Sequence, residues 1–317
     1  MKIHIATLFD KNYVVRTVAF YEALAKLGEY TFWFLCLDND SKVLLEKLAL
    51  PNVVLKTLDD LSDTELMATK SDRSVGEFAF TAKSVFVNYV ANKTPNGEAL
   101  IFADNDVIFF LPPDNLLEEM REDNYSIGIT LHRFPKDKDY MNDRVGKYNA
   151  GLLFFILDPD SRACISDWRR DCIDWCYLKY EEERFGDQKY IMKWPKNYKG
   201  VYVILNKGVN TGSWNLFNWN VTKQGEQFFI DQDPLECYHF HRVKFYADGK
   251  EVKMLPIYFY HQELYKIYEE QIGKAWQKIL EVDLDWNYGF VEKPNIFRII
   301  KQRITSFLTR HRKQSSE

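Results

Sequence analysis

Short apolar segments alternate with longer amphipathic segments through the first half of the chain, and this alternation limits the fold more than any other feature. The predicted strands lie at residues 3–9, 31–37, 53–58, from 99 onward and at 125–131. The predicted helices lie at 13–27, 42–50, 80–92 and 159–183, with another starting near 185. Strands that alternate with helices form a mostly parallel sheet covered on both faces. The predicted class is therefore α/β and Rossmann-like.

Length and composition predict one main domain with an extension. The 317 residues, 46% of them hydrophobic, are enough for a large core. We expect the main domain to span 1–248 and a helical C-terminal extension to span 249–317. The first residues are charged too early for a signal peptide, and no apolar run reaches the ~20 residues that span a bilayer. Five irregularly spaced cysteines predict buried free thiols and a cytoplasmic protein.

Two carboxylates follow the apolar strand that begins at Ala99. Asp104 and Asp106 are two positions apart, so in an extended segment they point the same way. Carboxylates that close repel each other unless a cation or a proton lies between them. Because ligands bind at the carboxyl ends of strands in α/β sheets, this pair predicts a divalent metal site.

The spacing of that pair is not specific by itself. Asp-x-Asp occurs six times in the chain, and the triplet Asp38-Asn39-Asp40 also follows an apolar strand. Capping explains the first triplet, because Asp40 or Ser41 can satisfy free N–H groups of a helix starting near Val43. Context must therefore distinguish the second triplet from the other copies.

Three further motifs follow along the chain. Asn149-Ala150-Gly151 leads into a buried strand and lets backbone approach a ligand closely. Two explanations fit Asp187 in Gly186-Asp187-Gln188: a site residue or a helix N-cap. The sequence alone favours the N-cap. His239 and His241 lie at i and i+2 on a strand-like segment, and neutral imidazole is a common ligand of transition metals.

These four motifs, in this order, resemble the GT-A-fold glycosyltransferases. The resemblance is strongest to the retaining family-eight type, which includes glycogenin and lipopolysaccharide galactosyltransferases, and to bacterial nucleotide-diphospho-sugar transferases. It covers residues 1–245 and implies a GT-A sheet domain at 1–248. It also selects the second Asp-Asn-Asp triplet, because only that copy precedes the other three motifs.

The resemblance implies a role for each motif. In the family a manganese or magnesium ion bridges the two phosphates of the donor. The resemblance implies that its ligands here are Asp104, Asp106, His239 and, as a second candidate, His241. The implied nucleotide-sugar contacts are Thr7, Phe9, Asp10, Lys83, Asp104, Asn105, Gly151 and Lys244. The implied catalytic and sugar-lining residues are Asn149, Asp187 and Gln188. Arg242 stands where the family often has glycine, so the assignment of Lys244 departs from the family pattern.

The predicted activity is a metal-dependent transfer of a sugar from a nucleotide-diphospho-sugar, by family default a UDP-sugar. The acceptor is a saccharide or lipid-linked oligosaccharide, and retention of configuration in surface-polysaccharide or lipopolysaccharide synthesis is expected from the resemblance. Three alternatives stay open. They are a sugar-phosphate nucleotidyltransferase, a haloacid-dehalogenase-like phosphatase and a non-catalytic sugar-binding protein on a transferase fold.

Charge and aromatic residues add two local hypotheses. The chain carries a net charge of −4, with a basic excess after residue 292, so the acidic body argues against nucleic-acid binding. The basic amphipathic pattern at 295–313 predicts either peripheral contact with the inner face of the membrane or packing on the main domain.

The segment 208–220, with two Trp and several Asn, fits a sugar-contacting loop or an ordinary loop anchored in the core.

Overall fold

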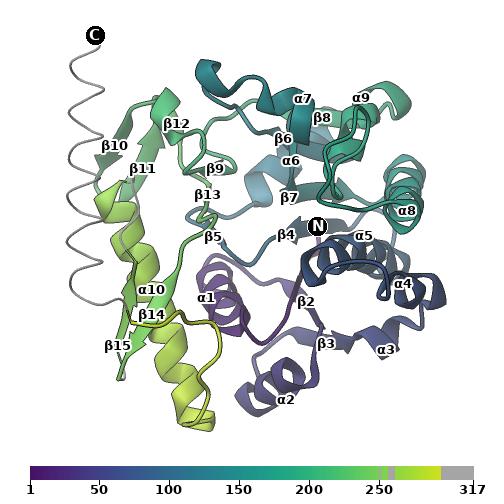
Figure 1. Ribbon diagram of the computed structural model, residues 1–317. Coiled ribbons are helices and arrows are strands. Elements are labelled where there is room, and N and C mark those ends of the chain that lie inside the picture. The colour runs from purple at the N-terminus through teal and green to yellow at the C-terminus, as the bar shows by residue number, and fades with distance from the viewer. Residues whose placement is uncertain (250, 256–260, 294–317) are drawn as a thin grey trace.

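The central sheet has seven strands in the order β3-β2-β1-β4-β7-β6-β8 (Figure 1). The computed structural model describes residues 1–249, 251–255 and 261–293. The strands are β1 (Ile3–Phe9), β2 (Thr31–Cys36), β3 (Val53–Thr57), β4 (Ala99–Ala103), β6 (Ile127–Leu131), β7 (Tyr148–Ile156) and β8 (Val201–Ile204). Four of the neighbouring pairs are parallel, which confirms the predicted α/β class.

Helices cover both faces of this sheet (Figure 1). One core joins the sheet to α1 (Val14–Leu24), α2 (Asn39–Leu48), α6 (Asp114–Glu122) and α10 (Gln262–Val282). The other core joins it to α4 (Thr64–Thr69), α5 (Val75–Lys93) and α8 (Pro159–Asp174). The remaining α-helices are α3 (Leu58–Leu61), α7 (Met141–Val145) and α9 (Trp194–Asn197). Strands buried on both faces read as continuous apolar runs, which is why the sequence located them well.

β7 runs antiparallel to both of its neighbours, β4 and β6. Its register pairs Ala103, the last residue of β4, with Leu152. The start of β7 therefore lies at the same edge of the sheet as the carboxyl ends of β4 and β6. This single reversal places the Asn149-Ala150-Gly151 motif beside the Asp104-Asn105-Asp106 motif.

A small sheet next to this edge carries the histidine motif. β13 (Cys237–His239) pairs with β5 (Val107–Phe109) and β9 (Thr211–Gly212), and His239 lies opposite Val107. A second small sheet contains β10 (Val221–Gln224), β11 (Gln227–Ile230) and β12 (Asp233–Pro234). Because β5 follows directly on the Asp104–Asp106 turn, pairing with β5 brings His239 to the carboxylates.

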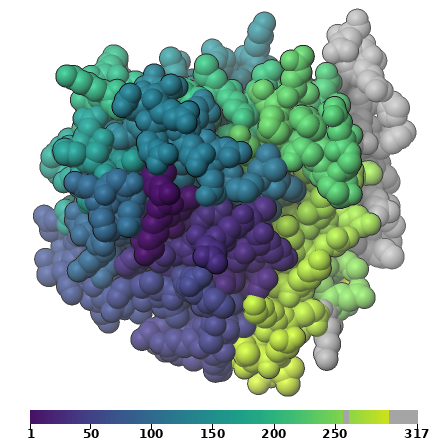
Figure 2. All heavy atoms as spheres, turned by 180° about the vertical axis from the view of Figure 1, so that it is seen from behind, coloured from purple at the N-terminus to yellow at the C-terminus, as the bar shows by residue number. Residues whose placement is uncertain are grey.

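The C-terminal part of the described chain packs on the N-terminal part. The hairpin β14 (Phe245–Asp248) and β15 (Glu251–Met254) spans position 248/249, where the sequence suggested a domain boundary. α10 contacts α1, and in the rear view it lies beside the purple N-terminal elements (Figure 2). The predicted membrane-contacting stretch 295–313 lies outside the described residues. Among those described, no helix combines the length and the apolar character needed to cross a membrane.

Several predicted helix boundaries are wrong. α5 begins at Val75 and not at residue 80, because Ser74 caps it by accepting from the Glu77 N–H. α8 ends at Asp174, not near residue 183, because the buried Arg73 guanidinium donates to the carbonyls of Cys172 and Ile173 and so satisfies the end of the helix. The helix after β2 begins one turn earlier than expected, at Asn39, and Asp38 caps it by accepting from the Ser41 N–H at 2.8 Å. All five cysteines are free and buried, as predicted.

Glu236, next to β13, should make stability depend on pH. Burial, with Glu119 and Asp233 nearby, raises its pKa from 4.5 to about 7. A raised folded-state pKa means that its contribution is complete below about pH 4.5 and is lost as the pH rises through about 7. Glu236→Gln should therefore exceed the wild type in stability at pH 8, by on the order of 1 kcal/mol, and match it near pH 4.

Urea unfolding at several pH values measures this difference. Glu226→Gln, at a fully exposed turn, is the matched control and should stay within about 0.5 kcal/mol of the wild type. A stability gain for Glu236→Gln that is the same at pH 4 and pH 8 contradicts the prediction.

Candidate active site

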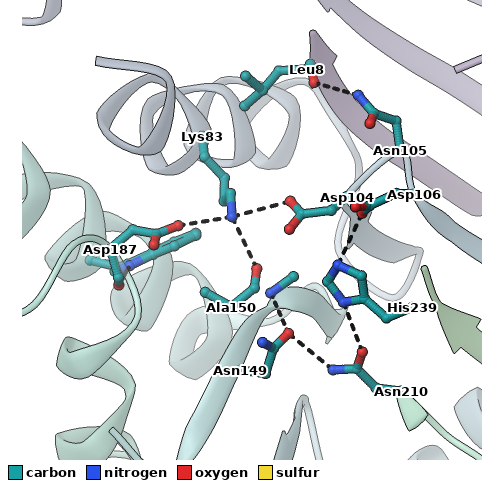
Figure 3. A network of polar contacts seen from close by, with 12 residues as sticks. Leu8, Lys83, Asp104, Asn105, Asp106, Asn149, Ala150, Asp187, Asn210 and His239 are labelled. Carbon is teal, nitrogen blue, oxygen red and sulfur yellow. Dashed lines mark hydrogen bonds and ion pairs between the residues drawn. The ribbon is translucent and has the colours of Figure 1, made fainter. Parts of the chain in front are cut away.

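Asp104 and Asp106 lie in a tight turn between β4 and β5, not in an extended segment as the sequence argument assumed. The Val107 N–H donates to the Asp104 carbonyl at 3.0 Å and closes this turn. Both carboxylates still face the site, but each has a different partner (Figure 3). Asp104 lies 3.2 Å from the Lys83 ammonium, and Asp106 lies 2.9 Å from Nε2 of His239. Asn105 turns away and donates to the carbonyl of Leu8 at 3.2 Å.

Lys83 connects two of the predicted site residues. Its buried ammonium lies 3.2 Å from Asp104 and 2.9 Å from Asp187, and it reaches the Ala150 carbonyl at 3.4 Å (Figure 3). Burial disfavours the charged amine, but Asp104 and Asp187 outweigh it and raise the pKa of Lys83. Burial likewise raises the pKa of Asp187, although Lys83 opposes that shift. The side chain of Asp187 therefore pairs with Lys83 and does not cap a helix, so the capping explanation is wrong.

The hydrogen bonds around His239 determine which of its nitrogens carries a proton. The Gly151 N–H donates to Oδ1 of Asn149 at 2.9 Å, so the Asn210 atom that contacts this oxygen at 3.1 Å is the donor Nδ2. Oδ1 of Asn210 must then accept from Nδ1 of His239, at 3.2 Å. The remaining nitrogen of His239, Nε2, faces Asp106.

This geometry makes Nε2 of His239 either a proton carrier or a metal ligand. A neutral ring with its hydrogen on Nδ1 cannot donate to Asp106, so the ion pair requires an imidazolium. Burial disfavours that charge, but Asp106 outweighs it and raises the pKa of His239. The same pairing lowers the pKa of Asp106 despite its burial. A metal ion that replaces the proton would find an imidazole already oriented from behind by Asn210.

One candidate metal group stands out among the described residues. Asp106, His239 and His241 each offer a ligand atom, and these atoms lie within 4.8 Å of one another. His241 lies beyond the end of β13, with its ring centroid 5.8 Å from that of His239. Trp214 contacts both rings edge-on, at 5.1 and 6.0 Å, and so holds the two imidazoles from one side. Two imidazoles and a carboxylate suit a transition metal better than magnesium.

Glycine at position 151 is required by the crowding at the base of the site. A Cβ there would lie 2.6 Å from the His239 ring and 2.8 Å from a carboxylate oxygen of Asp104. The Asp104 N–H also donates to the Gly151 carbonyl at 2.8 Å. The start of β7 thus forms the base on which the carboxylates and the imidazole meet.

Asn149 contributes to this base from inside the protein. Its oxygen accepts from Gly151 and Asn210, and its Nδ2 donates to His132 at 3.1 Å. Nδ1 of buried His132 donates to the Gly146 carbonyl at 3.0 Å. Burial lowers the pKa of His132 to about 4, so this ring is a neutral link in the network.

The predicted nucleotide contacts at the end of β1 lie next to the β4–β5 turn, because Asn105 donates to the carbonyl of Leu8. Thr7 and Phe9 are buried, and Phe9 packs edge-on against Phe34. Asp10 accepts from the Asn12 N–H at 2.9 Å in the loop after β1. Lys244 is exposed beyond the histidine segment. Contacts join the motifs of β4, α5, β7, residue 187 and β13, while the ligand contacts of the base-pocket residues and Lys244 stay predictions. Gln188 lies beside Asp187 and donates to the Val145 carbonyl at 2.9 Å.

The sequence argument missed two residues that orient the site. Asn210 belongs to the segment 208–220, which the amide side chains had marked, but its role depends on a hydrogen bond to a residue 29 positions away. His132 directly follows β6, and only the antiparallel pairing of β6 with β7 brings it to Asn149. Trp214 donates to the His132 carbonyl at 2.8 Å, so this part of the segment is anchored in the protein.

The chain is similar in sequence to two proteins of Bacillus subtilis (strain 168). The chain is 30% identical over 241 residues to the uncharacterized protein YfnD, a match that covers 75% of this chain and 76% of YfnD. The chain belongs to the YfnD family. It is also 26% identical over 301 residues to the uncharacterized protein YfnF, covering 90% of this chain and 97% of YfnF. No protein-family model matches this member of the YfnD family.

Solved structures show that this YfnD relative has the GT-A fold expected from its sequence. The galactosyltransferase LgtC, in complex with donor and acceptor sugar analogs, matches with a TM-score of 0.56 and 12% identity, over 93% of this chain and 99% of LgtC. The glycosyltransferase GlyE of Streptococcus pneumoniae TIGR4 matches with a TM-score of 0.52 and 13% identity, over 89% of this chain and 62% of GlyE. At such low identity these likenesses concern the fold.

Proposed function

We propose that this protein is a metal-dependent glycosyltransferase that moves a sugar from a nucleotide-diphospho-sugar to a saccharide acceptor. One observation supports this most strongly. Charged side chains from α5, the β4–β5 turn, the segment at 187 and β13 converge on one edge of a GT-A sheet. Open α/β sheets bind ligands at that edge. The family-eight resemblance, which predicted these residues, further favours a UDP-sugar donor and retention of configuration.

The residues at the β4–β5 turn fit a divalent ion. Asp106 and His239 would hold it, with Asp104 beside them and His241 as a further ligand. When bound, the ion would stabilise negative charge on the departing diphosphate without a proton transfer. The buried hydrogen bond from His239 to Asn210 supports this assignment, because metal-binding histidines generally donate their second N–H to an oriented oxygen. Manganese suits this donor set, and magnesium is the alternative.

The chain's other charged residues complete the proposed chemistry. In the transfer, the acceptor oxygen bonds to the anomeric carbon, the bond from that carbon to the phosphate oxygen breaks, and the acceptor proton passes to the departing diphosphate. Lys83 stays charged and opposes the developing negative charge. Asp187, held 2.9 Å from Lys83, would orient the donor sugar or stabilise positive charge at its anomeric carbon. Surface-polysaccharide or lipopolysaccharide synthesis is the setting that we propose for this activity.

A thermal-shift experiment tests the proposal directly. The full chain is heated with UDP, UDP-glucose, UDP-galactose or UDP-N-acetylglucosamine, each with and without MnCl2. A donor at 100 times its Kd should stabilise the protein by about 2.7 kcal/mol, and only when manganese is present. Free UDP released from the stabilising donor is then measured. If no nucleotide sugar raises the melting temperature in the presence of manganese, the proposed activity is wrong.

Asn210→Ala should weaken manganese binding although Asn210 is not itself a ligand. Removing the acceptor for Nδ1 leaves His239 free to rotate or to change tautomer, and loss of such a partner costs about 10- to 100-fold in metal affinity. Asn218→Ala is the matched control, because Asn218 lies in the same segment and donates to the Arg133 carbonyl at the surface. Calorimetric titration with MnCl2 compares the two variants. Equal affinities would contradict the orienting role of Asn210.

A further inference from the structure

A stack of aromatic and guanidinium groups lies beside Asp187 and has no part in the chemistry above. Arg144 of α7 lies between two tyrosine rings, 5.6 Å from the centroid of Tyr140 and 5.1 Å from that of Tyr180. Tyr180 stacks on Phe185 with centroids 4.9 Å apart and planes 9° apart. We call these four residues, Tyr140, Arg144, Tyr180 and Phe185, the rim stack.

Contacts tie the rim stack firmly to the proposed catalytic residues. Gln188 donates to the carbonyl of Val145, the last residue of α7. The Lys189 ammonium donates to the carbonyls of Asp143 in α7 and Glu181 in the opposite segment, the latter at 2.8 Å. Both sides of the rim are thereby fixed to the two residues that follow Asp187. The rim stack is therefore a preorganised part of this edge and not a pair of independent surface loops.

Phe80 continues the aromatic surface toward the charged centre. Gly186, between Phe185 and Asp187, has a positive φ of 52°, and a Cβ there would lie 3.8 Å from the Phe80 ring. The Lys83 ammonium lies 5.4 Å from the centroid of the same ring. Phe80 thus lies between Gly186, which follows the rim residue Phe185, and the ammonium of Lys83.

Both tyrosines of the rim stack and a nearby leucine leave about half of their surface exposed to solvent. Tyr140 is 55% exposed and Tyr180 is 53% exposed, and the neighbouring Leu178 is 51% exposed. Single exposed apolar residues are ordinary, but a group that hydrogen bonds tie to the residues following Asp187 indicates a contact surface. Tyrosine suits such a surface because its ring is apolar and its hydroxyl is polar.

We propose that the rim stack is the acceptor subsite and that it binds the ring of a neutral pyranoside. Arg144 and Phe185 already pack against the Tyr180 ring, so the C–H face of a sugar would pack on the end ring, Tyr140, which the other rings hold in place. The edge of the guanidinium and the tyrosine hydroxyls would bond to sugar hydroxyls. The segment beside Tyr180 carries Glu181, Glu182 and Glu183 against Lys179 and Arg184. With Arg144 of the stack itself these charges balance, which favours a sugar without a net charge. The inference rests on the proposed function only in calling the bound sugar an acceptor.

Saturation-transfer NMR on the full chain tests the subsite. The probes are methyl β-D-glucopyranoside, methyl β-D-galactopyranoside and methyl N-acetyl-β-D-glucosaminide at millimolar concentration. The wild type should bind at least one of them, Tyr180→Phe should retain that binding, and Tyr180→Ala and Arg144→Ala should weaken it about tenfold. Tyr125→Ala is the control, because Tyr125 stacks on Tyr202 near the start of β6, at the opposite edge of the sheet, and should change nothing.

Two parallel readouts separate this inference from the proposed function. The thermal shift with UDP and manganese is measured on the same variants, where Tyr180→Ala should match the wild type. Absence of glycoside binding, or equal binding by wild type and Tyr180→Ala, overturns the subsite and leaves transferase activity standing. Glycoside binding that Tyr180→Ala abolishes, in a protein that responds to no nucleotide sugar, supports the subsite and contradicts the transferase.

Discussion

Asp106→Asn should lose manganese binding and lower sugar transfer by on the order of 10²- to 10³-fold, as when one preorganised contact to developing charge is removed. Asp106 lies 2.9 Å from Nε2 of His239 and belongs to the candidate metal group. The asparagine keeps the size of the side chain but removes the charge that holds both the ion and the imidazole. Calorimetric titration with MnCl2 and the release of UDP from the preferred donor measure the two effects.

The chain supplies its own matched control for this substitution. Asp40 occupies the equivalent place in the other Asp-Asn-Asp triplet, is 49% exposed and pairs with Lys11 at 2.8 Å on the surface. Asp40→Asn should leave metal binding and transfer unchanged and cost at most about 1 kcal/mol of stability. If the two substitutions have the same effect, the second triplet is not the metal site.

Lys83→Met should destabilise the protein by about 3–5 kcal/mol, because it leaves the buried Asp187 carboxylate without its cation. The ammonium lies 2.9 Å from Asp187 and 3.2 Å from Asp104, and solvent compensates little for its loss, since the Asp187 side chain is only 6% exposed. The melting temperature should fall by roughly 4–8 °C, because the unfolding entropy of a 317-residue chain is about 0.7 kcal/mol/K. Differential scanning calorimetry without nucleotide or metal measures the change in protein stability separately from any change in ligand binding.

A second variant distinguishes charge from packing in this result. Lys83→Met combined with Asp187→Asn removes both members of the buried pair, so it should recover part of the lost stability while transfer stays abolished. If the single variant melts with the wild type, or if the double variant is less stable than the single one, the charge argument is wrong.

The strands were predictable because burial on both faces produces continuous apolar runs. The Ala99–Ala103 and Ile3–Phe9 strands could be located to within a residue or two for that reason. The end of α8 could not, because it depends on Arg73, which lies 99 positions before the carbonyl that it satisfies. A local sequence window contains no information about such a partner.

Some site residues were likewise predictable from the sequence, and others depend on contacts between distant parts of the chain. Asp104, Asp106 and His239 belong to two short motifs that the family resemblance could order, and the structure brings these two motifs together. Their turn geometry, the pairing of Lys83 with Asp187 and the role of Asn210 depend on tertiary contacts. Thr7 and Phe9, at the strand end that resembles a base pocket, are buried, and their contact with the nucleotide stays a prediction.

The strand that carries His239 leans on the last described helix, α10. Phe240 stacks on Tyr268 of α10 with centroids 4.0 Å apart, and Tyr238 meets Tyr265 edge-on at 5.8 Å. α10 lies on the outer flank of the molecule, against α1 (Figure 1). A substitution of Tyr268 should therefore disturb His239 from outside the site, because Phe240, which follows His239, stacks on that ring.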